Sequence, residues 1–541
     1  MRSRRVAAFL AIPLSVALVT SACGGSGGNS EGGSDDGACG RQTNATISYN
    51  GTEPESPLLV PGDATDTGGV KVLAALFTGL VEYNPRTAAP RNAVAESIET
   101  TDSRVYTITL KDGWTFHDGT PVTAKSFADA WNYAAYSPNA QQTASFFQEI
   151  EGFDQVNAPQ PTAHEMSGLR VVDDRTLEVT LAMPSSVFPI KLGYAAFAPL
   201  PEAFFADQAA FEAHPIGNGP FRFVSHQPGK NIIVERYEKY AGECQPSIQG
   251  VEFRFYKSLE AAYADVVSNK LDYIEMTPES ALAGNKFQSD LPNRHLSQTY
   301  LGVQGISFPL YDGRFDNPQL RQAISMAIDR ETVIQQIFNG LKEPADGYVP
   351  PSVPGRAESQ CGQLCTYQPE RARLMFEATG FEGPIELTSN DDSANQAFIQ
   401  ATCATITNAL ARECHYVPVP TLGEFRRAIN AHEMSTLYRS GWVADYPSIE
   451  NFLNPRFRTG GSANGGLYSN PAVDQLLARA DAASSVEEGN ALYQEAERLV
   501  LRDMPVIPLW FQTVQPGWST RLHNVVVTQF RELDLFSVTV S

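Results

Sequence analysis

The chain has 541 residues, of which 42% are hydrophobic and 19% charged, and its formal net charge is −21 at pH 7. This length exceeds that of one ordinary domain, and the composition is that of a globular protein rather than a disordered one. An anionic surface repels phosphate groups, so we expect neither a nucleic acid partner nor docking of a basic patch on anionic lipids.

The N-terminal residues have the order of an export signal. Three arginines at the start precede an apolar stretch over residues 6–19, which has the length of a signal-peptide core. Small residues then lead into Cys23, and this junction resembles a bacterial lipobox, in which the cysteine receives lipid. We therefore predict a lipoprotein signal peptide over residues 1–22 and a lipidated Cys23, with a plain signal peptide as the alternative. The Gly/Ser-rich residues 23–40 are expected to form a flexible tether.

Alternating polarity predicts two strands in the first half of the chain. Residues 105–110 and 176–181 each place apolar side chains at every second position, as a strand with one buried face does. A helix is expected between these strands, over residues 126–136. Near the C-terminus, the apolar residues 506–511 follow Pro505 and predict a buried strand.

Polar caps mark the predicted helices of the second half. An Asn-Pro pair at 317–318 opens one helix, because proline costs nothing in the first turn, and an Asn-Gly pair at 339–340 ends it. A second Asn-Pro pair, at 470–471, opens another helix, and the capping box formed by Ser485 and Glu488 opens a third. Strands and helices alternate without an internal repeat, which indicates a mixed α/β fold.

The seven cysteines are best explained as one lipid attachment site and three disulfides. If Cys23 carries lipid, an even number remains in an oxidising compartment. Zinc is the rival explanation, but the C-x3-C spacing has no second cysteine pair or histidine pair beside it, so we expect no metal site. Short separations favour pairing of Cys361 with Cys365 and of Cys403 with Cys414, which would leave Cys39 with Cys244.

The sequence contains only incomplete matches to enzyme motifs. A glycine-rich run at 24–28 fits the nucleophile-elbow pattern, but it lies in the tether without a flanking strand and helix. The pairs at 164–165 and 432–433 begin like a zincin motif and lack its second histidine. We therefore expect no catalytic residue and no cofactor, and a secreted hydrolase remains the less favoured class.

Five stretches, read in chain order, resemble the bacterial extracellular solute-binding protein family 5, whose members are peptide-, opine- and nickel-binding subunits of ABC importers. Together they run over nearly the whole chain after the tether. The stretches are residues 95–125, 214–221, 315–330, 439–447 and 468–474.

The resemblance implies a type II periplasmic-binding-protein-like α/β fold, with two hinged lobes and an inserted third lobe. Ligand would lie in the cleft between the first and third lobes, which close by hinge motion. The implied boundaries are lobe I over 41–80, 197–297 and 506–541, lobe II over 81–196, and lobe III over 298–505.

The function implied is capture of short peptides and their delivery to an ABC transporter permease. The protein would be a monomer held by its lipid anchor at the outer face of the cytoplasmic membrane. Other solutes bound within the family, such as oligosaccharides, nickel complexes or haem, are the alternatives, and a sensor of peptide signals is a further one.

The resemblance also assigns ligand-binding residues within the motif at 439–447. Asp445 matches an aspartate that pairs with the peptide ammonium, and its alternative role is to cap the turn before Pro447. Arg439 matches an arginine that meets the peptide carboxylate, although a structural salt bridge would explain it equally well. Trp442 would form the wall of a side-chain pocket or belong to the core, and Gly441 precedes it in the same motif.

Overall fold

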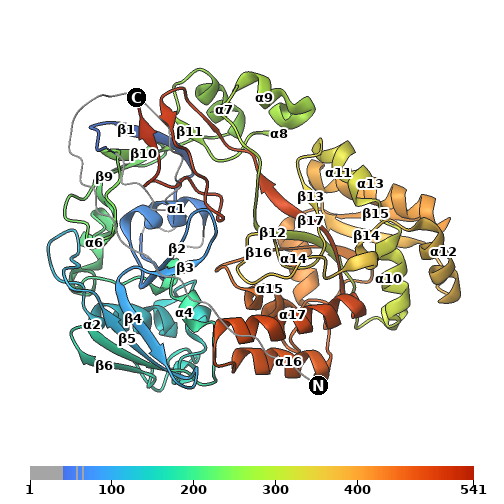
Figure 1. The fold of residues 1–541 in the computed structure, drawn as a ribbon, viewed down its shortest axis with the longest axis horizontal. Coiled ribbons are helices and arrows are strands. Elements are labelled where there is room, and N and C mark those ends of the chain that lie inside the picture. The colour runs from blue at the N-terminus through green and yellow to red at the C-terminus, as the bar shows by residue number, and fades with distance from the viewer. Residues whose placement is uncertain (1–40, 56–58, 64–65) are drawn as a thin grey trace, which may run out of the picture. The chain divides into compact units, whose positions relative to one another are not determined.

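The computed structural model of the protein describes residues 41–541 apart from 56–58 and 64–65 (Figure 1). The predicted signal peptide, the tether, Cys23 and Cys39 lie outside the described residues. The fold is mixed α/β, as the alternation of strands and helices predicts, and the strands in the described residues form two six-stranded sheets, one four-stranded sheet and two small pairs.

The first six-stranded sheet has the order β18-β11-β1-β10-β9-β8. Its central strand β1 runs parallel to β10 and to β11. Asp66 caps helix α1, because its side chain accepts a hydrogen bond from the Gly69 amide at 2.9 Å. The strands are β1 Thr46–Gly51, β8 Phe221–Gln227, β9 Asn231–Arg236, β10 Gly250–Phe255, β11 Tyr273–Ile274 and β18 Gly517–Trp518. The helices of this part are α1 Thr67–Leu76, α5 Glu202–Ala206, α6 Gln208–Ala213, α7 Leu259–Val267, α8 Glu279–Leu282 and α9 Lys286–Asp290.

The four-stranded sheet is antiparallel, in the order β4-β5-β7-β6. Two of its strands are the two predicted from alternation, and helix α2 packs on β6 and β7. Trp131 anchors α2, since its indole N–H donates to the Phe197 carbonyl at 3.0 Å. The strands are β4 Ala95–Thr100, β5 Val105–Leu110, β6 Leu169–Asp173 and β7 Thr176–Thr180. The helices are α2 Ala124–Ala135, α3 Phe153–Val156 and α4 Phe188–Lys191.

The second six-stranded sheet has the order β13-β17-β12-β16-β14-β15. Residues 506–514, which the sequence analysis places with 515–541 in lobe I, form β17, and β17 pairs with β12 in this sheet. The continuous apolar sequence of β17 explains this, since it suits a strand buried within a sheet. The strands are β12 Gln298–Ser307, β13 Glu343–Pro344, β14 Ile385–Asn390, β15 Cys414–Val419, β16 Leu437–Val443 and β17 Val506–Val514. The small pairs are β2 Val81–Tyr83 with β3 Pro90–Asn92, and β19 Leu522–His523 with β20 Thr539–Val540.

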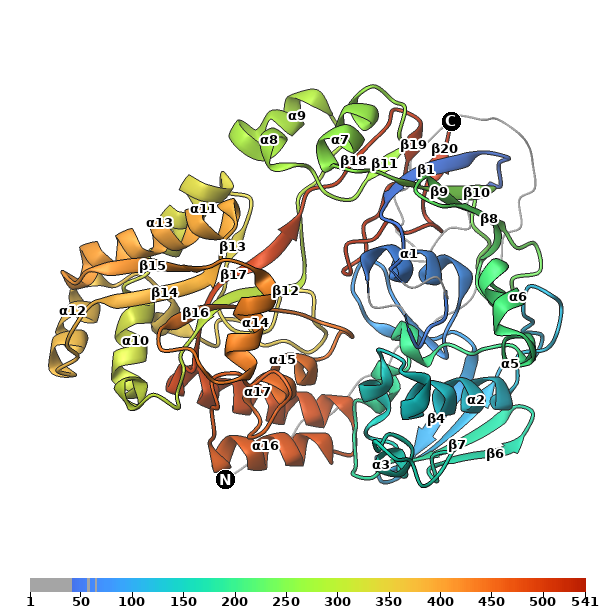
Figure 2. The same cartoon turned by 180° about the vertical axis from the view of Figure 1, so that it is seen from behind.

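The chain crosses between the two large sheets in two neighbouring connections, one entering β12 and one leaving β17 (Figures 1 and 2). Hydrogen bonds join the two connections. The Thr277 amide donates to the Gln515 carbonyl at 2.8 Å, and the Gln515 side chain donates to the Ser297 hydroxyl at 3.0 Å. The two crossings therefore form a paired link between the sheets.

The predicted helix over residues 317–340 is in fact two helices, α10 and α11. Asn317 caps α10 as predicted, but Asp329 caps a new helix, because its side chain accepts from the Thr332 amide at 3.0 Å. The predicted caps at Asn470 and Ser485 are confirmed. The helices of this part are α10 Pro318–Met326, α11 Arg330–Phe338, α12 Pro369–Ala378, α13 Ser393–Leu410, α14 Leu422–Asn430, α15 Ile449–Phe457, α16 Pro471–Asp481 and α17 Val486–Asp503.

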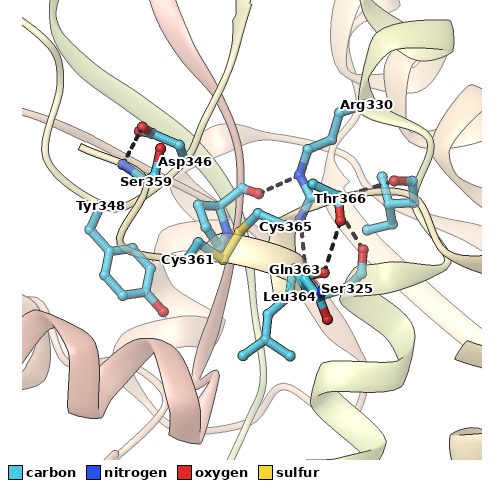
Figure 3. Close-up of a disulfide and its surroundings, with 12 residues drawn as sticks. Ser325, Arg330, Asp346, Tyr348, Ser359, Cys361, Gln363, Leu364, Cys365 and Thr366 are labelled. Carbon is cyan, nitrogen blue, oxygen red and sulfur yellow. Dashed lines mark hydrogen bonds between the residues drawn. A yellow bond between two sulfur atoms is a disulfide. The ribbon is translucent and has the colours of Figure 1, made fainter. Parts of the chain in front are cut away.

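Two of the three predicted cysteine pairs lie at disulfide distance. The S–S separation is 1.93 Å for Cys361 and Cys365 and 2.10 Å for Cys403 and Cys414. Figure 3 shows the first pair. The third predicted pair includes Cys39, which lies outside the described part of the chain.

Arg330 ties the turn around Cys361 and Cys365 to the sheet (Figure 3). Its guanidinium donates to the Pro508 carbonyl at 2.8 Å and to the Ser325 hydroxyl at 2.9 Å, and that hydroxyl donates to the Leu364 carbonyl at 2.6 Å. Burial lowers the pKa of Arg330 to about 9, and the ion pairs among the described residues do not include it. Hydrogen bonds to neutral groups therefore compensate this buried cation.

We expect Arg330→Lys to lower the free energy of unfolding by about 2 kcal/mol, because a lysine ammonium cannot reach the same set of acceptors in one plane. Urea unfolding followed by circular dichroism measures this loss. Arg373→Lys is the control, since Arg373 is exposed and pairs only with Glu377 one turn away on α12. Equal stability of the two variants would contradict the structural role of Arg330.

Across the residues that the structure describes, the helices are too short or too polar to span a membrane.

Candidate functional site

The predicted ligand-binding motif lies on β16 and on the turn between β16 and α15. Strand β16 pairs antiparallel with β12 along Tyr438–Val443, so that Gly441 lies opposite Gln304 and Trp442 opposite Val303. On its other edge, β16 pairs with β14 only at Leu437 and Tyr438.

The C-terminal half of β16 therefore has one open edge. Within the described sheet, no strand pairs with this edge from Arg439 to Val443. Gly441 and Val443 are exposed there, and Val443 keeps 47% of its surface accessible. Backbone donors and acceptors along such an edge are available for a further extended segment.

Asp445 lies directly after this open edge. Its side chain is half-buried, and burial raises the pKa of the carboxyl above its usual range. The Asn451 amide donates to Asp445 Oδ2 at 3.4 Å, while the Asp445 backbone N–H donates to Asn451 Oδ1 at 3.3 Å. No ion pair formed by residues in the described ranges includes Asp445. Its charge is thus compensated by hydrogen bonds alone.

The charge of Asp445 affects the pKa values of two tyrosines from distant parts of the chain. Burial raises the pKa of Tyr83 and of Tyr194, and the neighbouring Asp445 carboxylate raises both pKa values further. Tyr83 ends β2, stacks on Phe530 at 5.4 Å between ring centroids, and donates its hydroxyl to the Ile190 carbonyl at 2.7 Å. Tyr83 and Tyr194, from two distant parts of the chain, therefore lie close enough to Asp445 to be affected by its charge.

Trp442 is joined to Asp445 through Asn451. Its indole N–H donates to Asn451 Oδ1 at 3.0 Å, and the half-buried ring packs against the core of the second sheet. The structure therefore gives Trp442 part of the core role that was the alternative, while its role as a pocket wall stays a prediction.

Arg439 lies farther back along β16 and has different neighbours. Its guanidinium donates to Asn390 Oδ1 at 3.1 Å, and its Cζ lies 5.8 Å from the ring centroid of Phe425. The Nε atom is buried without a hydrogen-bond partner, and burial lowers the pKa of Arg439, which nearby Asp392 partly opposes. The alternative of a structural salt bridge is not seen, because none of the ion pairs in the described chain contains Arg439.

Sequence reasoning missed Asn451, Tyr83 and Tyr194. Asn451 falls in the first turn of α15, where polar residues are common for local reasons, so its type carries no signal of a site. The tyrosines are far from the motif in sequence. Only tertiary structure brings them to Asp445.

A separate cavity of about 330 Å³ lies beside the 214–221 stretch, away from Asp445, and its lining includes His117, His214, Arg222 and Glu235. Both ring nitrogens of His117 face backbone groups: the Gly217 amide donates to Nδ1 at 3.1 Å, and Nε2 lies 3.1 Å from the Gly219 carbonyl oxygen. Burial lowers the pKa of His117 to about 4, so its ring is neutral at pH 7. His117 is a structural histidine that fixes this turn.

Nowhere in the described ranges do three or more histidine, cysteine or carboxylate side chains gather in a way that would hold a metal ion.

The open edge of β16 can pair with a further extended segment. Residues 89–464 match the family model described as bacterial extracellular solute-binding proteins, family 5 Middle. The chain belongs to this family, as the five sequence stretches predict.

Relatives and solved structures agree over most of the chain. The oligopeptide-binding protein OppA of Bacillus subtilis is 25% identical over 518 residues, which is 92% of each chain. The unliganded open form of the periplasmic murein tripeptide-binding protein MppA has a TM-score of 0.80 and is 22% identical, covering 92% of this chain and 97% of its own. OppA of Haemophilus influenzae, solved with the peptide RPPGFSPFR, has a TM-score of 0.70 and is 19% identical, covering 93% and 100%.

We expect Asp445→Asn to raise the free energy of unfolding by about 1 kcal/mol at pH 7. The substitution removes a negative charge that is partly buried, and the new amide oxygen still accepts a hydrogen bond from Asn451. Since the pKa of Asp445 is raised in the folded protein, the ionised form costs stability at neutral pH. The gain should vanish as the pH falls below the usual range of an aspartate, where the carboxyl is protonated in both states.

Thermal unfolding of the ligand-free protein between pH 3 and pH 7 measures this gain. Asp154→Asn is the control, because Asp154 is exposed on α3. A loss of stability at pH 7 would show that Asp445 is a structural residue and would contradict the expectation.

Proposed function

We propose that this protein captures short peptides at the open edge of β16, with Asp445 receiving the peptide ammonium, and delivers them to an ABC transporter permease. In this proposal it binds its ligand and catalyses no reaction. The observation that carries the proposal is the open edge of β16 ending beside a carboxylate without a cation.

The chemistry of a free peptide explains the arrangement. A peptide backbone has unpaired N–H and C=O groups. An open strand edge can form hydrogen bonds with these groups whatever the peptide side chains are. The peptide ammonium needs a negative partner when it leaves water, and Asp445 supplies one at the end of the edge. One short peptide therefore satisfies both features at once.

The relatives support a peptide rather than another solute. The names of the Bacillus subtilis and Escherichia coli relatives state oligopeptide binding, and the latter is 25% identical over 86% of each chain. Of the other family ligands, a neutral sugar would leave the Asp445 carboxylate without a cationic partner.

Within this proposal, Arg439 is the candidate for the peptide carboxylate. It lies on the same strand as the open edge, its Nε has no hydrogen-bond partner, and no carboxylate among the described residues pairs with it. A planar guanidinium is well suited to a carboxylate. Trp442 and Gly441 would contact the ligand between these two charges.

Closure over the ligand would use the paired connections into β12 and out of β17 as the hinge. The proposed lobes then keep the implied boundaries, with the start of the C-terminal portion of lobe I moved from 506 to the end of β17 at Val514.

Native mass spectrometry of the purified protein, followed by gentle denaturation, identifies the bound ligand. We expect a series of short peptides within a narrow length range. In Asp445→Ala, the peptides should be lost, because an unpaired ammonium weakens binding by on the order of 2–5 kcal/mol. Titration calorimetry with one identified peptide then measures the loss.

Asp154→Ala is the matched control and should bind like the unmodified protein. A sugar, a nickel complex or haem released from the unmodified protein would contradict the peptide assignment. Unchanged peptide affinity in Asp445→Ala would remove Asp445 from the site.

We also propose that Cys23 anchors the protein by lipid at the outer face of the cytoplasmic membrane, and that it acts there as a monomer. The two cysteine pairs at disulfide distance support an oxidising compartment, since disulfides persist there and are rare in the cytosol.

Expression of the full chain with Cys23→Ser should release the protein from the membrane fraction, because no acyl chain is then attached. Immunoblotting of membrane and supernatant fractions measures this, with Cys361→Ser as a cysteine control that leaves the anchor intact. Membrane retention of Cys23→Ser would refute the anchor.

A further inference from the structure

Asn451 is a buried amide at the centre of the candidate site. Only 2% of its surface is exposed, although it is polar and lies in the first turn of α15. Its Oδ1 accepts two hydrogen bonds, from the Trp442 indole at 3.0 Å and from the Asp445 backbone at 3.3 Å. Its Nδ2 donates to the Asp445 carboxylate at 3.4 Å.

The surroundings fix the orientation of this amide. Two N–H donors face one end and a carboxylate faces the other, so only an oxygen toward the donors and a nitrogen toward Asp445 satisfies all three contacts. An aspartate at this position would place a second negative charge against Asp445. An apolar residue would leave the Trp442 and Asp445 N–H groups without this partner.

Asn451 is not needed to cap its helix. Ser448 is the N-cap of α15, and its hydroxyl accepts from the Glu450 amide at 3.2 Å. The hydrogen bonds of the Asn451 side chain instead all run back to the ligand-binding motif.

We infer that Asn451 is a positioning residue for ligand recognition, which holds Asp445 and Trp442 in one geometry and favours the ionised form of Asp445. The inference rests on the proposed role of Asp445 as the partner of the ligand ammonium. Burial disfavours the Asp445 charge, and the donor on Asn451 acts in the opposite direction, lowering the pKa of that carboxyl. Asn451 therefore offsets part of the cost of presenting a carboxylate to the ligand.

If Asn451 favours the ionised carboxylate of Asp445, replacing Asn451 should change ligand affinity in a way that depends on pH and on the ligand ammonium. A ligand ammonium needs ionised Asp445, so affinity is lost as the pH falls through the pKa of this carboxyl in the free protein. Without the Asn451 donor the pKa rises further, and the loss begins at a higher pH. The Asp445 carboxylate acts on the phenols of Tyr83 and Tyr194, and neither phenol ionises in the acid range. The adjoining titratable groups Tyr446 and Glu450 are hydrogen-bonded to each other at 2.7 Å, and Glu450 lies 3.8 Å from the Lys191 ammonium.

The test compares Asn451→Leu and the milder Asn451→Ser with Asn454→Leu. Asn454 lies one turn along the same helix, and its amide nitrogen donates to Glu450 at 3.1 Å and to Asp481 at 3.0 Å, away from the ligand-binding motif. Each variant is titrated with one short peptide carrying a free N-terminus and with its N-acetylated form, from pH 4 to pH 8. Circular dichroism confirms that each variant is folded.

We expect both Asn451 variants to bind the free-amine peptide about tenfold more weakly, while the acetylated peptide, which lacks the ammonium, shows only the smaller loss that follows from the changed setting of Trp442. In both Asn451 variants, the loss of affinity on acidification should begin at a higher pH than in the unmodified protein. Asn454→Leu should change neither the affinity for the free-amine peptide nor this pH dependence. An equal loss for both peptides with an unmoved pH profile would mean a merely structural role and would overturn the inference.

Asp445→Asn in the same series separates this inference from the proposed function. If Asp445→Asn abolishes the preference for the free amine and the folded Asn451 variants keep it, the inference alone fails. If Asp445→Asn leaves the preference intact, the assignment of Asp445 fails, and the role of Asn451 fails with it.

Discussion

A carboxylate that is withdrawn from water without a cation beside it costs stability, and Asp445 is held in this way. This destabilising carboxylate lies where β16 ends and where the outer edge of β16 is unpaired. Asn451 supplies partial compensation through its hydrogen bond to the carboxylate. Under the proposed function, a ligand with a positive group at one end of an extended backbone would supply the missing cation and pair with the open edge.

The position of β16 depends in turn on β12. This strand lies between β17 and β16, so the register of β12 sets where Gly441 and Trp442 are placed. Strands β12 and β17 are also the strands through which the chain passes from one large sheet to the other. The site is therefore built directly onto the link between the two sheets, and a rotation about that link moves β16 with respect to the first sheet.

Local sequence patterns predicted the elements whose determinants are local. Strand β5, strand β7 and the caps of α16 and α17 follow from alternation and from polar residues before an apolar run. The helix predicted over 317–340 failed because its apolar periodicity continues across the break, whereas Asp329 starts a new helix and Arg330 hydrogen-bonds to the carbonyls of Ser325 and Ile328.

Only those site residues that lie together in one short stretch of sequence could be predicted. Asp445 and Trp442 belong to one short motif, and the structure links them. Tyr83 and Tyr194 reach Asp445 through tertiary packing of segments far from the motif, which no periodicity encodes. The sheet that β17 joins was likewise not predictable, because a buried apolar strand fits either large sheet and only its pairing with β12 decides between them.

The open edge of β16 has a consequence for the protein between binding events. Unpaired backbone groups on a strand are a template for any extended chain, including an unfolded neighbour, and this is how edge-to-edge aggregation begins. Strand β16 limits the hazard by its composition: the open stretch is short, it contains Gly441, and it begins at Arg439, a charge that repels a second copy in register. If Arg439 receives the peptide carboxylate as proposed, the same cation would also oppose pairing of this edge with a second copy.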